Sequence, residues 1–318
     1  MFRIEPKASN TNTLDIINTI MLSIGIYLVS AVLMPFFLFI IPAPSIVLSI
    51  KKGTKYGLLS MTLVCIVAYL FNRTAMNLTL LLYMIPIVII MSSMIKEDES
   101  FGKIMGVNIF ASLFITIVSL LTFRYILKVD ILFEVNSFFT EMSKFMEEIL
   151  LKSNFTETNM QQILKAYNFM KILLPGIVVL AATALNYGSF AFSKNLLKKQ
   201  NIKISQNFKF IDYRISFKIL LPTLFAVGVA YLLYYFKNPY FEIVLYNLVF
   251  IYSLFFILAG ISLFDYYLVG KIPKILRLIL PAVVLYLFRG EILYIAVATV
   301  DMLVNFRKRF KRIENEEK

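Results

Sequence analysis

The sequence predicts an all-α fold, a polytopic transmembrane helical bundle of about 8–10 spans with an external amphipathic helical segment. Hydrophobic residues make up 59% of the 318 residues and charged residues only 16%. A soluble domain of this size needs roughly 25% charged residues to solvate its surface, so much of this surface faces lipid. Long uncharged runs recur along the chain, and they must be helical because lipid cannot satisfy open backbone groups.

The apolar runs give the expected positions of the spans. A helix needs about 20 residues to cross roughly 30 Å of hydrocarbon. Uncharged runs of about that length occupy residues 56–72, 74–95, 104–123, 172–193, 219–236 and 243–264. Each of these runs is expected to form one transmembrane helix.

The first apolar block is too long for one span. Residues 16–50 contain no charged side chain, and a single helix of that length would extend about 52 Å, far beyond the bilayer. Proline removes a backbone donor and crowds the preceding turn, so Pro35, Pro42 and Pro44 should break the helix. We predict a hairpin that turns near residues 34–35 and has a short second arm ending at Lys51.

The last apolar block, residues 275–305, is interrupted by charged residues. Two short crossings joined at residues 289–291 fit the pattern, and so does a re-entrant or interfacial pair of helices. One crossing does not fit, because it would put the basic tail on the wrong side of the membrane. Asp301 falls near the cytoplasmic end of this block. Pairing with Arg307 or with neighbouring lysines is therefore a better expectation than a role in proton relay.

Residues 127–171 form the largest segment between spans and are expected to lie outside the membrane. Apolar residues recur there at helical spacing, at Ile131, Val135, Phe138, Met142, Phe145 and Ile149. Such a stripe predicts an amphipathic helix, and Thr158 with Gln161 forms a capping-box pattern before a second helix. The two helices should lie on the outer membrane surface or roof a cavity.

We expect a single integral membrane domain over residues 1–318, because no repeat, linker or soluble domain is evident. Lysine and arginine are enriched in segments expected to face the cytoplasm, notably residues 51–55, residues 194–218 and the basic tail at about 307–318. The positive-inside rule then places both termini in the cytoplasm of a bacterial cytoplasmic (plasma) membrane. The N-terminus lacks the basic region and cleavage site of a removed signal, so the first span should be retained.

The composition excludes several kinds of chemistry. The chain has no histidine, which rules out His-centred acid–base catalysis, Ser-His-Asp triads and His-ligated metal sites. It has no Gly-rich phosphate loop and no metal-ligand spacing, and its one cysteine, Cys65, lies in an apolar run as a packing residue. We expect no catalytic residues, no metal, no cofactor and no enzyme activity. The net charge of +13 comes from loop residues and does not predict nucleic-acid binding.

Polar residues inside spans are the remaining candidates for function, because polar groups in lipid are unfavourable and often mark pathways. Asn186 and Tyr187 lie in the run at 172–193, and Asn247 lies in the run at 243–264. They are candidate ligand-binding residues. The alternative is that the two amides form hydrogen bonds between helices.

Small residues at four-residue spacing mark a second kind of candidate site. Ala184 and Gly188 form one such pair, and Ala226 and Ala230 form another. Small side chains let helix backbones approach closely in a membrane. These faces should contact either another helix of the same chain or a partner protein.

Four features, in their order and spacing, carry a resemblance to a known family. They are the proline-broken hairpin with Pro35 and Pro42, Leu174-Pro175-Gly176 leading to Ala184, Asn186 and Tyr187, Asn247 with Gly260, and the ending Asp301, Asn305, Phe306, Arg307, Lys308 and Arg309. Over nearly its whole length the chain resembles the YybS-like family of bacterial membrane proteins. That family is loosely similar to the substrate-binding membrane subunits (S components) of energy-coupling-factor vitamin transporters.

The resemblance implies a subunit that captures a small molecule outside the cell. It would pass the molecule across the membrane together with a transmembrane coupling subunit and its ATPases. The leading hypothesis is thus an S-component-like uptake subunit with a small polar ligand, buried near the outer side beneath residues 127–171. The alternative is a substrate-free membrane scaffold or assembly factor for envelope or membrane complexes. In both cases the lipid bilayer is a partner.

Overall fold

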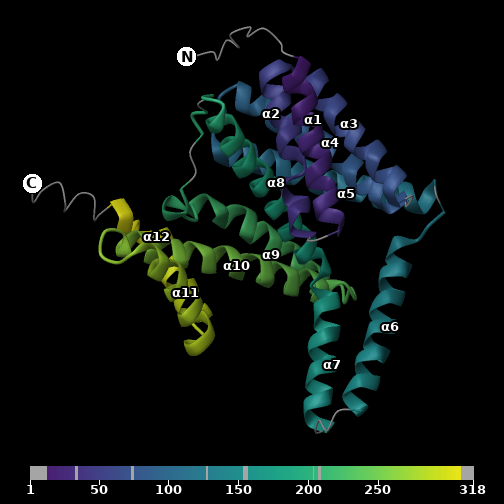
Figure 1. The fold of residues 1–318 in the computed structure, drawn as a ribbon. Coiled ribbons are helices and arrows are strands. Elements are labelled where there is room, and N and C mark those ends of the chain that lie inside the picture. The colour runs from purple at the N-terminus through teal and green to yellow at the C-terminus, as the bar shows by residue number, and fades with distance from the viewer. Residues whose placement is uncertain are drawn as a thin grey trace, which may run out of the picture. The chain divides into compact units, whose positions relative to one another are not determined.

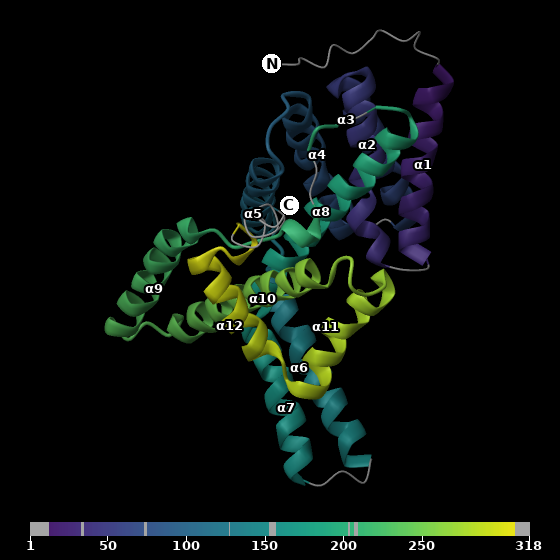
Figure 2. The same ribbon diagram turned by 90° about the vertical axis from the view of Figure 1, so that its left-hand side faces the viewer.

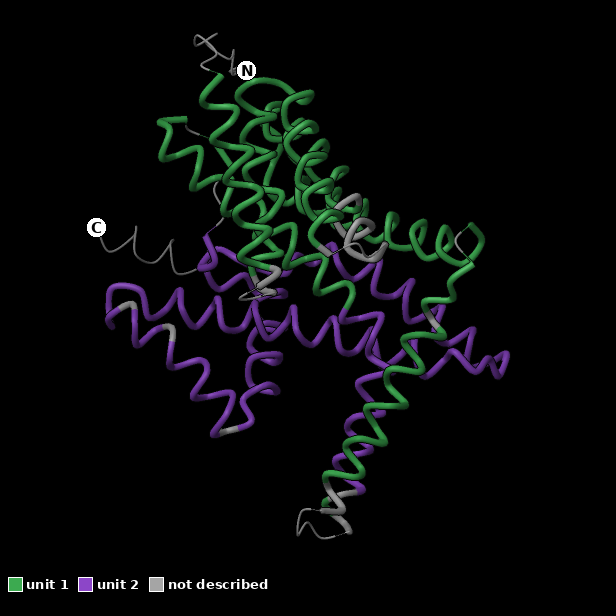
Figure 3. Tube along the Cα trace, turned by 45° about the vertical axis from the view of Figure 1, so that its right-hand side comes forward, with its two compact units in different colours: residues 1–160, 178–207 green, residues 161–177, 208–318 purple. Residues whose placement is uncertain are grey.

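The computed structural model describes residues 13–32, 35–72, 75–126, 128–152, 157–202, 204–206 and 209–308. Within these residues every regular element is a helix, which confirms the all-α prediction (Figure 1). The chain divides into two compact units, shown in Figure 3. Unit 1 is Met1–Met160 with Val178–Asn207, and unit 2 is Gln161–Ile177 with Phe208–Lys318. A single membrane domain over residues 1–318 stays a prediction.

Unit 1 contains the N-terminal helices and most of α8. Its elements are α1 (Thr13–Val32), the 3₁₀ helix η1 (Pro35–Ile40), α2 (Pro42–Lys52), α3 (Thr54–Asn72), α4 (Ala75–Lys96), α5 (Phe101–Tyr125), α6 (Ile131–Lys152) and α8 (Leu174–Lys199). Prolines start η1 and α2, as expected of a residue that lacks a backbone N–H. The predicted short second arm is α2, which ends at Lys52, while the turn predicted near residues 34–35 falls partly outside the described residues.

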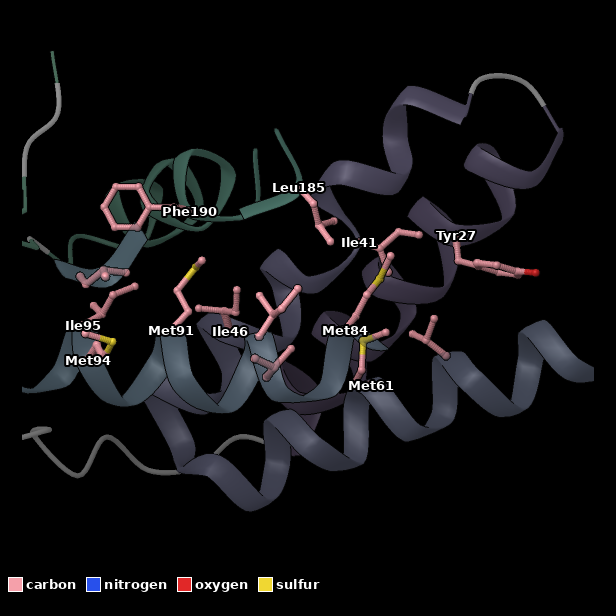
Figure 4. Close-up of a cluster of buried hydrophobic side chains, with 14 of the residues drawn as sticks. Tyr27, Ile41, Ile46, Met61, Met84, Met91, Met94, Ile95, Leu185 and Phe190 are labelled. Atoms are coloured by element: carbon pink, nitrogen blue, oxygen red, sulfur yellow. The ribbon is translucent and has the colours of Figure 1, made fainter. Parts of the chain in front are cut away.

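The core of unit 1 surrounds α2, whose residues from Pro42 to Ser49 are all buried. Figure 4 shows side chains of this hydrophobic cluster, including Ile46 of α2, Met61 of α3 and Met91 of α4. Cys65 of α3 belongs to the same cluster and is 4% exposed. Burial of such side chains, at about 1.5–3 kcal/mol each, is the main term holding soluble cores together. In a bilayer, close packing of the same residues takes that role.

A line of hydroxyl groups lies beside this apolar cluster. The Ser45 hydroxyl donates to Ser60 Oγ at 3.0 Å, and Ser60 Oγ lies 3.2 Å from Ser23 Oγ. The helices carrying them approach closely because α3 has a glycine here, Gly57. An added Cβ at that position would lie 2.6 Å from the Ser45 carbonyl oxygen. Small and hydroxyl-bearing residues therefore join α1, α2 and α3, as is usual for membrane helices.

Unit 2 contains most of α7 and the C-terminal helices. Its elements are α7 (Glu157–Ile172), η2 (Phe210–Asp212), η3 (Phe217–Ile219), α9 (Leu220–Tyr235), α10 (Phe241–Leu268), α11 (Lys274–Phe288) and α12 (Glu291–Val304). The main contact is between α10 and α12. There Gly260 faces the backbone of α12, and an added Cβ would lie 2.8 Å from Tyr294 C. No larger residue fits without separating the two helices.

Six helices of the described residues are long and apolar enough to cross a membrane: Thr13–Ser30, Thr54–Phe71, α5, α8, Phe217–Tyr235 and α10. α11 and α12 meet at a bend of 120°, visible in Figure 2, and count as a seventh if they form one broken span. Tyr83–Lys96 of α4 is a shorter apolar helix.

This count is lower than the eight to ten spans expected from the sequence. α2 has 11 residues and is therefore about 16 Å long, too short to cross a bilayer. α11 and α12 have 15 and 14 residues, so neither crosses alone. Of the two arrangements expected for this block, the pair of separate crossings is therefore disfavoured. The observed break at Arg289 and Gly290 fits the expected re-entrant pair, and it also fits one broken span, which was not expected from the sequence.

The segment predicted to be external forms two helices, α6 and α7, as expected. On α6 the apolar stripe is only partly covered. Val135 and Met142 are half-buried, whereas Phe138 and Phe145 are exposed. α7 begins at Glu157, so Thr158 lies within the helix and not at its N-cap. The side chain of Thr158 is outside the described part of the chain.

Candidate functional site

Asn186 lies in the middle of α8 and is completely buried within unit 1. Its Nδ2 donates to the Ala182 carbonyl oxygen at 2.8 Å and to Ser112 Oγ of α5 at 2.9 Å. A carbonyl oxygen can only accept, so the contact with Ala182 fixes which end of the amide faces it. Oδ1 therefore points away, and no donor in the described residues reaches it.

Asn108, on α5, repeats this arrangement and was not among the residues predicted from the sequence. It is also fully buried, and its Nδ2 donates to the Ile104 carbonyl oxygen at 2.8 Å. That contact again fixes the amide orientation and leaves Oδ1 without a donor from the described chain. Asn108 and Ser112 are four residues apart, hence on the same face of α5. We call Asn108, Ser112 and Asn186 the amide cluster.

The amide cluster lies in apolar surroundings. Ile104 and Met105 of α5 and Leu185 and Phe190 of α8 are all buried members of the hydrophobic cluster of unit 1. Leu185 and Phe190 are labelled in Figure 4. The Phe101 ring meets the Phe190 ring edge-on at a centroid distance of 5.1 Å. The two amide oxygens, for which the described residues supply no donor, thus lie on helices that also carry residues of this hydrophobic cluster.

Tyr187 follows Asn186 in the sequence but is 45% exposed. One residue along an α-helix turns the side chain by about 100°, so it points to a different face. Its ring lies 6.5 Å from the Phe101 ring, centroid to centroid, in an edge-on contact. The structure therefore does not bring Tyr187 into the amide cluster.

Asn247 lies in unit 2, so the structure does not unite it with Asn186 in one unit. Its Oδ1 accepts from the Gly176 N–H at 2.6 Å, and its Nδ2 donates to the Ile172 and Ile243 carbonyl oxygens, both at 2.7 Å. Gly176 is in the first turn of α8, where backbone N–H groups have no helical partner. Asn247 therefore supplies, from α10, the cap that α8 needs, and it also holds the last residue of α7.

Gly176 has a further reason to be a glycine. An added Cβ would lie 2.8 Å from Asn247 Oδ1 and 2.9 Å from Phe250 Cδ1. Pro175 precedes it, and proline is favourable in the first turn because its missing N–H needs no partner there. The Leu174-Pro175-Gly176 motif and Asn247 thus form one structural junction between α7, α8 and α10. Both ends of this amide are occupied by the protein itself.

The predicted small-residue faces differ from one another. Gly188 approaches η1 closely, since an added Cβ would lie 3.0 Å from the Phe39 carbonyl oxygen. Ala184, its partner in the motif, is exposed. Ala230 of α9 is buried, and Ala226 is half-buried. Gly188 therefore has a packing role within unit 1, and contact of these faces with another protein stays a prediction.

A second buried polar group lies at the C-terminal end of unit 2. Arg307 Nε is 3.7 Å from Asp301 Oδ2, which confirms the predicted pairing. The Arg307 guanidinium also donates to the Ile211 carbonyl oxygen at 2.8 Å and to Ser262 Oγ at 3.2 Å. Burial lowers the pKa of Arg307, and the nearby Asp301 carboxylate opposes that shift. The pair ties the residues after α12 to the segment before α9.

Groups suited to metal chemistry are not found in the described residues, since no three of Cys, Asp, Glu or His lie close enough together to hold an ion. Two amide oxygens and one hydroxyl, without a nearby acid or base on the same helices, can bind through hydrogen bonds but offer no general acid or nucleophile.

Comparison with known proteins agrees with the membrane character of these helices. No curated protein and no solved structure matches the chain. A family model described as predicted membrane protein (DUF2232) matches residues 16–302, which include both units and the amide cluster. The chain therefore belongs to the DUF2232 family of predicted membrane proteins.

Proposed function

We propose that this membrane protein binds a small polar molecule inside unit 1, at the amide cluster. The observation that carries the proposal is the pair of fully buried amide oxygens, Asn108 Oδ1 and Asn186 Oδ1, for which the described chain supplies no donor. Leaving a buried acceptor unsatisfied costs about 1–3 kcal/mol. A bound molecule that supplies the missing donors to these two groups would remove that cost.

The role we propose for this binding is small-molecule uptake. The resemblance to the YybS-like family, and through it to the S components of energy-coupling-factor transporters, supports this role. A subunit of that kind carries no ATPase chemistry itself and works with a transmembrane coupling subunit and its ATPases. The absence of histidine agrees with binding without catalysis, and we accordingly propose that the chain is not an enzyme.

The second candidate is a substrate-free membrane scaffold or assembly factor, and Asn247 favours it. That amide is fully occupied by backbone groups of α7, α8 and α10, which is what a purely structural asparagine does. Of the side chains on α9, only Ala230 is buried, so much of that helix faces lipid or another protein. Under this alternative, water alone would satisfy Asn108 and Asn186.

Ligand capture by the purified full-length protein tests the proposal. Small molecules that co-purify are identified by mass spectrometry and then added back in a thermal-shift assay in detergent. Asn108→Leu and Asn186→Leu should each lose the retained molecule and its stabilising shift. Asn195→Leu, at an exposed position on the same helix α8, is the matched control and should keep both. Retention of the molecule by both cluster variants would refute binding at this site.

We also propose that the protein lies in a bacterial cytoplasmic membrane with both termini in the cytoplasm, because the segments at 51–55 and 194–218 are rich in lysine and arginine. A reporter fused at Asn154, between α6 and α7, should then report an external location. A cytoplasmic signal at that position would reverse the whole orientation. This test is independent of whether a ligand binds.

A further inference from the structure

We infer that the ligand of the amide cluster is an uncharged molecule that presents a carboxamide-like group, with two N–H donors and one carbonyl acceptor. The inference rests on the proposed function, because it assumes that the ligand binds at Asn108, Ser112 and Asn186. It goes further by naming the chemistry that those three side chains select.

Three of the four amide N–H donors of the cluster are already used. Asn108 Nδ2 donates to the Ile104 carbonyl oxygen, and Asn186 Nδ2 donates to the Ala182 carbonyl oxygen and to Ser112 Oγ. The two amides therefore offer a ligand both Oδ1 atoms and one N–H group, the second hydrogen of Asn108 Nδ2. An amide oxygen accepts and cannot donate, so the ligand must contribute at least two N–H or O–H groups.

The Ser112 hydroxyl adds one donor to this pattern. Its oxygen accepts from Asn186 Nδ2 at 2.9 Å, and its own O–H remains able to donate one hydrogen bond. With the remaining N–H of Asn108, the cluster offers two acceptors and two donors, which is the complement of a primary carboxamide or a urea, since an NH2 group donates twice and a carbonyl oxygen accepts twice. A molecule with acceptors alone, such as a carboxylate or a phosphate, would face two amide oxygens and be repelled.

The surrounding charges disfavour an ion. Residues 104–123 of α5 and 178–193 of α8 contain no charged side chain. The closest charge along α5, Lys103, is exposed and paired with Glu99. Moving an ion into such apolar surroundings without a counter-charge is far more costly than moving a neutral group. A protonated amine would satisfy the two oxygens but leave its charge unpaired, so a neutral donor is preferred.

Three small probes separate these possibilities: acetamide, acetate and N,N-dimethylacetamide. Acetamide has two N–H donors, acetate has the same shape with a negative charge, and the dimethyl compound keeps the carbonyl but has no N–H. Because all three probes are small, differences in their shape should have little effect on binding. Saturation-transfer difference NMR on the full-length protein in detergent measures the binding of each one, with Asn195→Leu as the control for partition into the micelle.

Acetamide should bind more tightly than either other probe. The expected factor is about threefold to tenfold, which corresponds to one hydrogen bond. The double variant Asn108→Leu/Asn186→Leu should remove that preference, and Asn195→Leu should keep it. Acetate binding that depends on the two asparagines would overturn the inferred ligand class while leaving the proposed site intact. Acetamide binding unchanged in the double variant, or no binding by any probe to the unaltered protein, would overturn the site as well.

Discussion

Three buried asparagines lie inside helices of the described residues, yet replacing Asn108 and replacing Asn247 should have different effects on stability. In Asn247→Leu the amide that caps α8 is lost. The Gly176 N–H, which is buried, and the half-buried Ile172 carbonyl oxygen lose their side-chain partner. At about 1–3 kcal/mol for each of the two groups left unsatisfied, the expected loss is about 2–6 kcal/mol of unfolding free energy.

Asn108→Leu has a different expected outcome. Among the described residues, the one hydrogen bond it removes is to the Ile104 carbonyl oxygen, which the backbone of α5 already satisfies. The same substitution also removes a buried oxygen without a donor. In protein freed of small molecules by extensive dialysis, the variant should be neutral or up to about 2 kcal/mol more stable than the unaltered chain.

Unfolding in detergent, followed by far-UV ellipticity, compares the two variants. Ellipticity is the suitable signal because the chain has no tryptophan. If Asn108→Leu loses as much stability as Asn247→Leu, then the Asn108 oxygen has a partner within the chain. The argument for the amide cluster would then fail.

Three further changes have defined outcomes. Gly260→Ala should cost about 1–3 kcal/mol by overpacking against the Tyr294 backbone, whereas Gly228→Ala, which meets no atom within 4 Å, should be neutral or slightly stabilising in the same thermal melt. Gly188→Leu should cost a similar amount and lower the yield of folded protein, and an unchanged melting temperature would place this face against lipid. Burial raises the pKa of Tyr213 from 10.0 to about 12. The resulting contribution to stability is therefore complete below pH 10 and is lost as the pH rises towards 12. Tyr213→Phe should remove this dependence of stability on pH, and identical curves for the variant and the unaltered protein would contradict the assignment.

The longer elements were predictable from the sequence because each is decided by residues close together in the chain. The runs at 104–123, 172–193, 219–236 and 243–264 correspond to α5, α8, α9 and α10. Length and lack of charge are local properties of the sequence. An apolar run of that length in lipid must form a helix, because only then are its backbone hydrogen bonds satisfied within the run itself. Six helices of the described residues, or seven if α11 and α12 form one span, are long and apolar enough to cross a membrane. A short apolar run in the sequence does not show whether it crosses the membrane or, like α2, is enclosed by other helices.

The candidate site was only half predictable. Asn186 was identified as a polar residue in a span, and Asn108 satisfies the same criterion in residues 104–123 but was passed over. Tyr187 met the same criterion as Asn186, but adjacent residues on a helix face different directions. The partners of Asn186 and Asn247 lie 74 and 71 residues away, respectively, at Ser112 and Gly176. No local pattern shows which helix faces meet, so their different roles required the structure.

Cys65 can serve as a natural probe for the opening of the core of unit 1. It is the only thiol in the chain and is almost fully enclosed by the core around α2. A maleimide can therefore modify the folded protein only during moments when that core opens. The modification rate then measures the frequency of opening without any engineered label. A molecule bound at a concentration 100 times its Kd should slow the reaction about 100-fold, provided that it does not bind the open form.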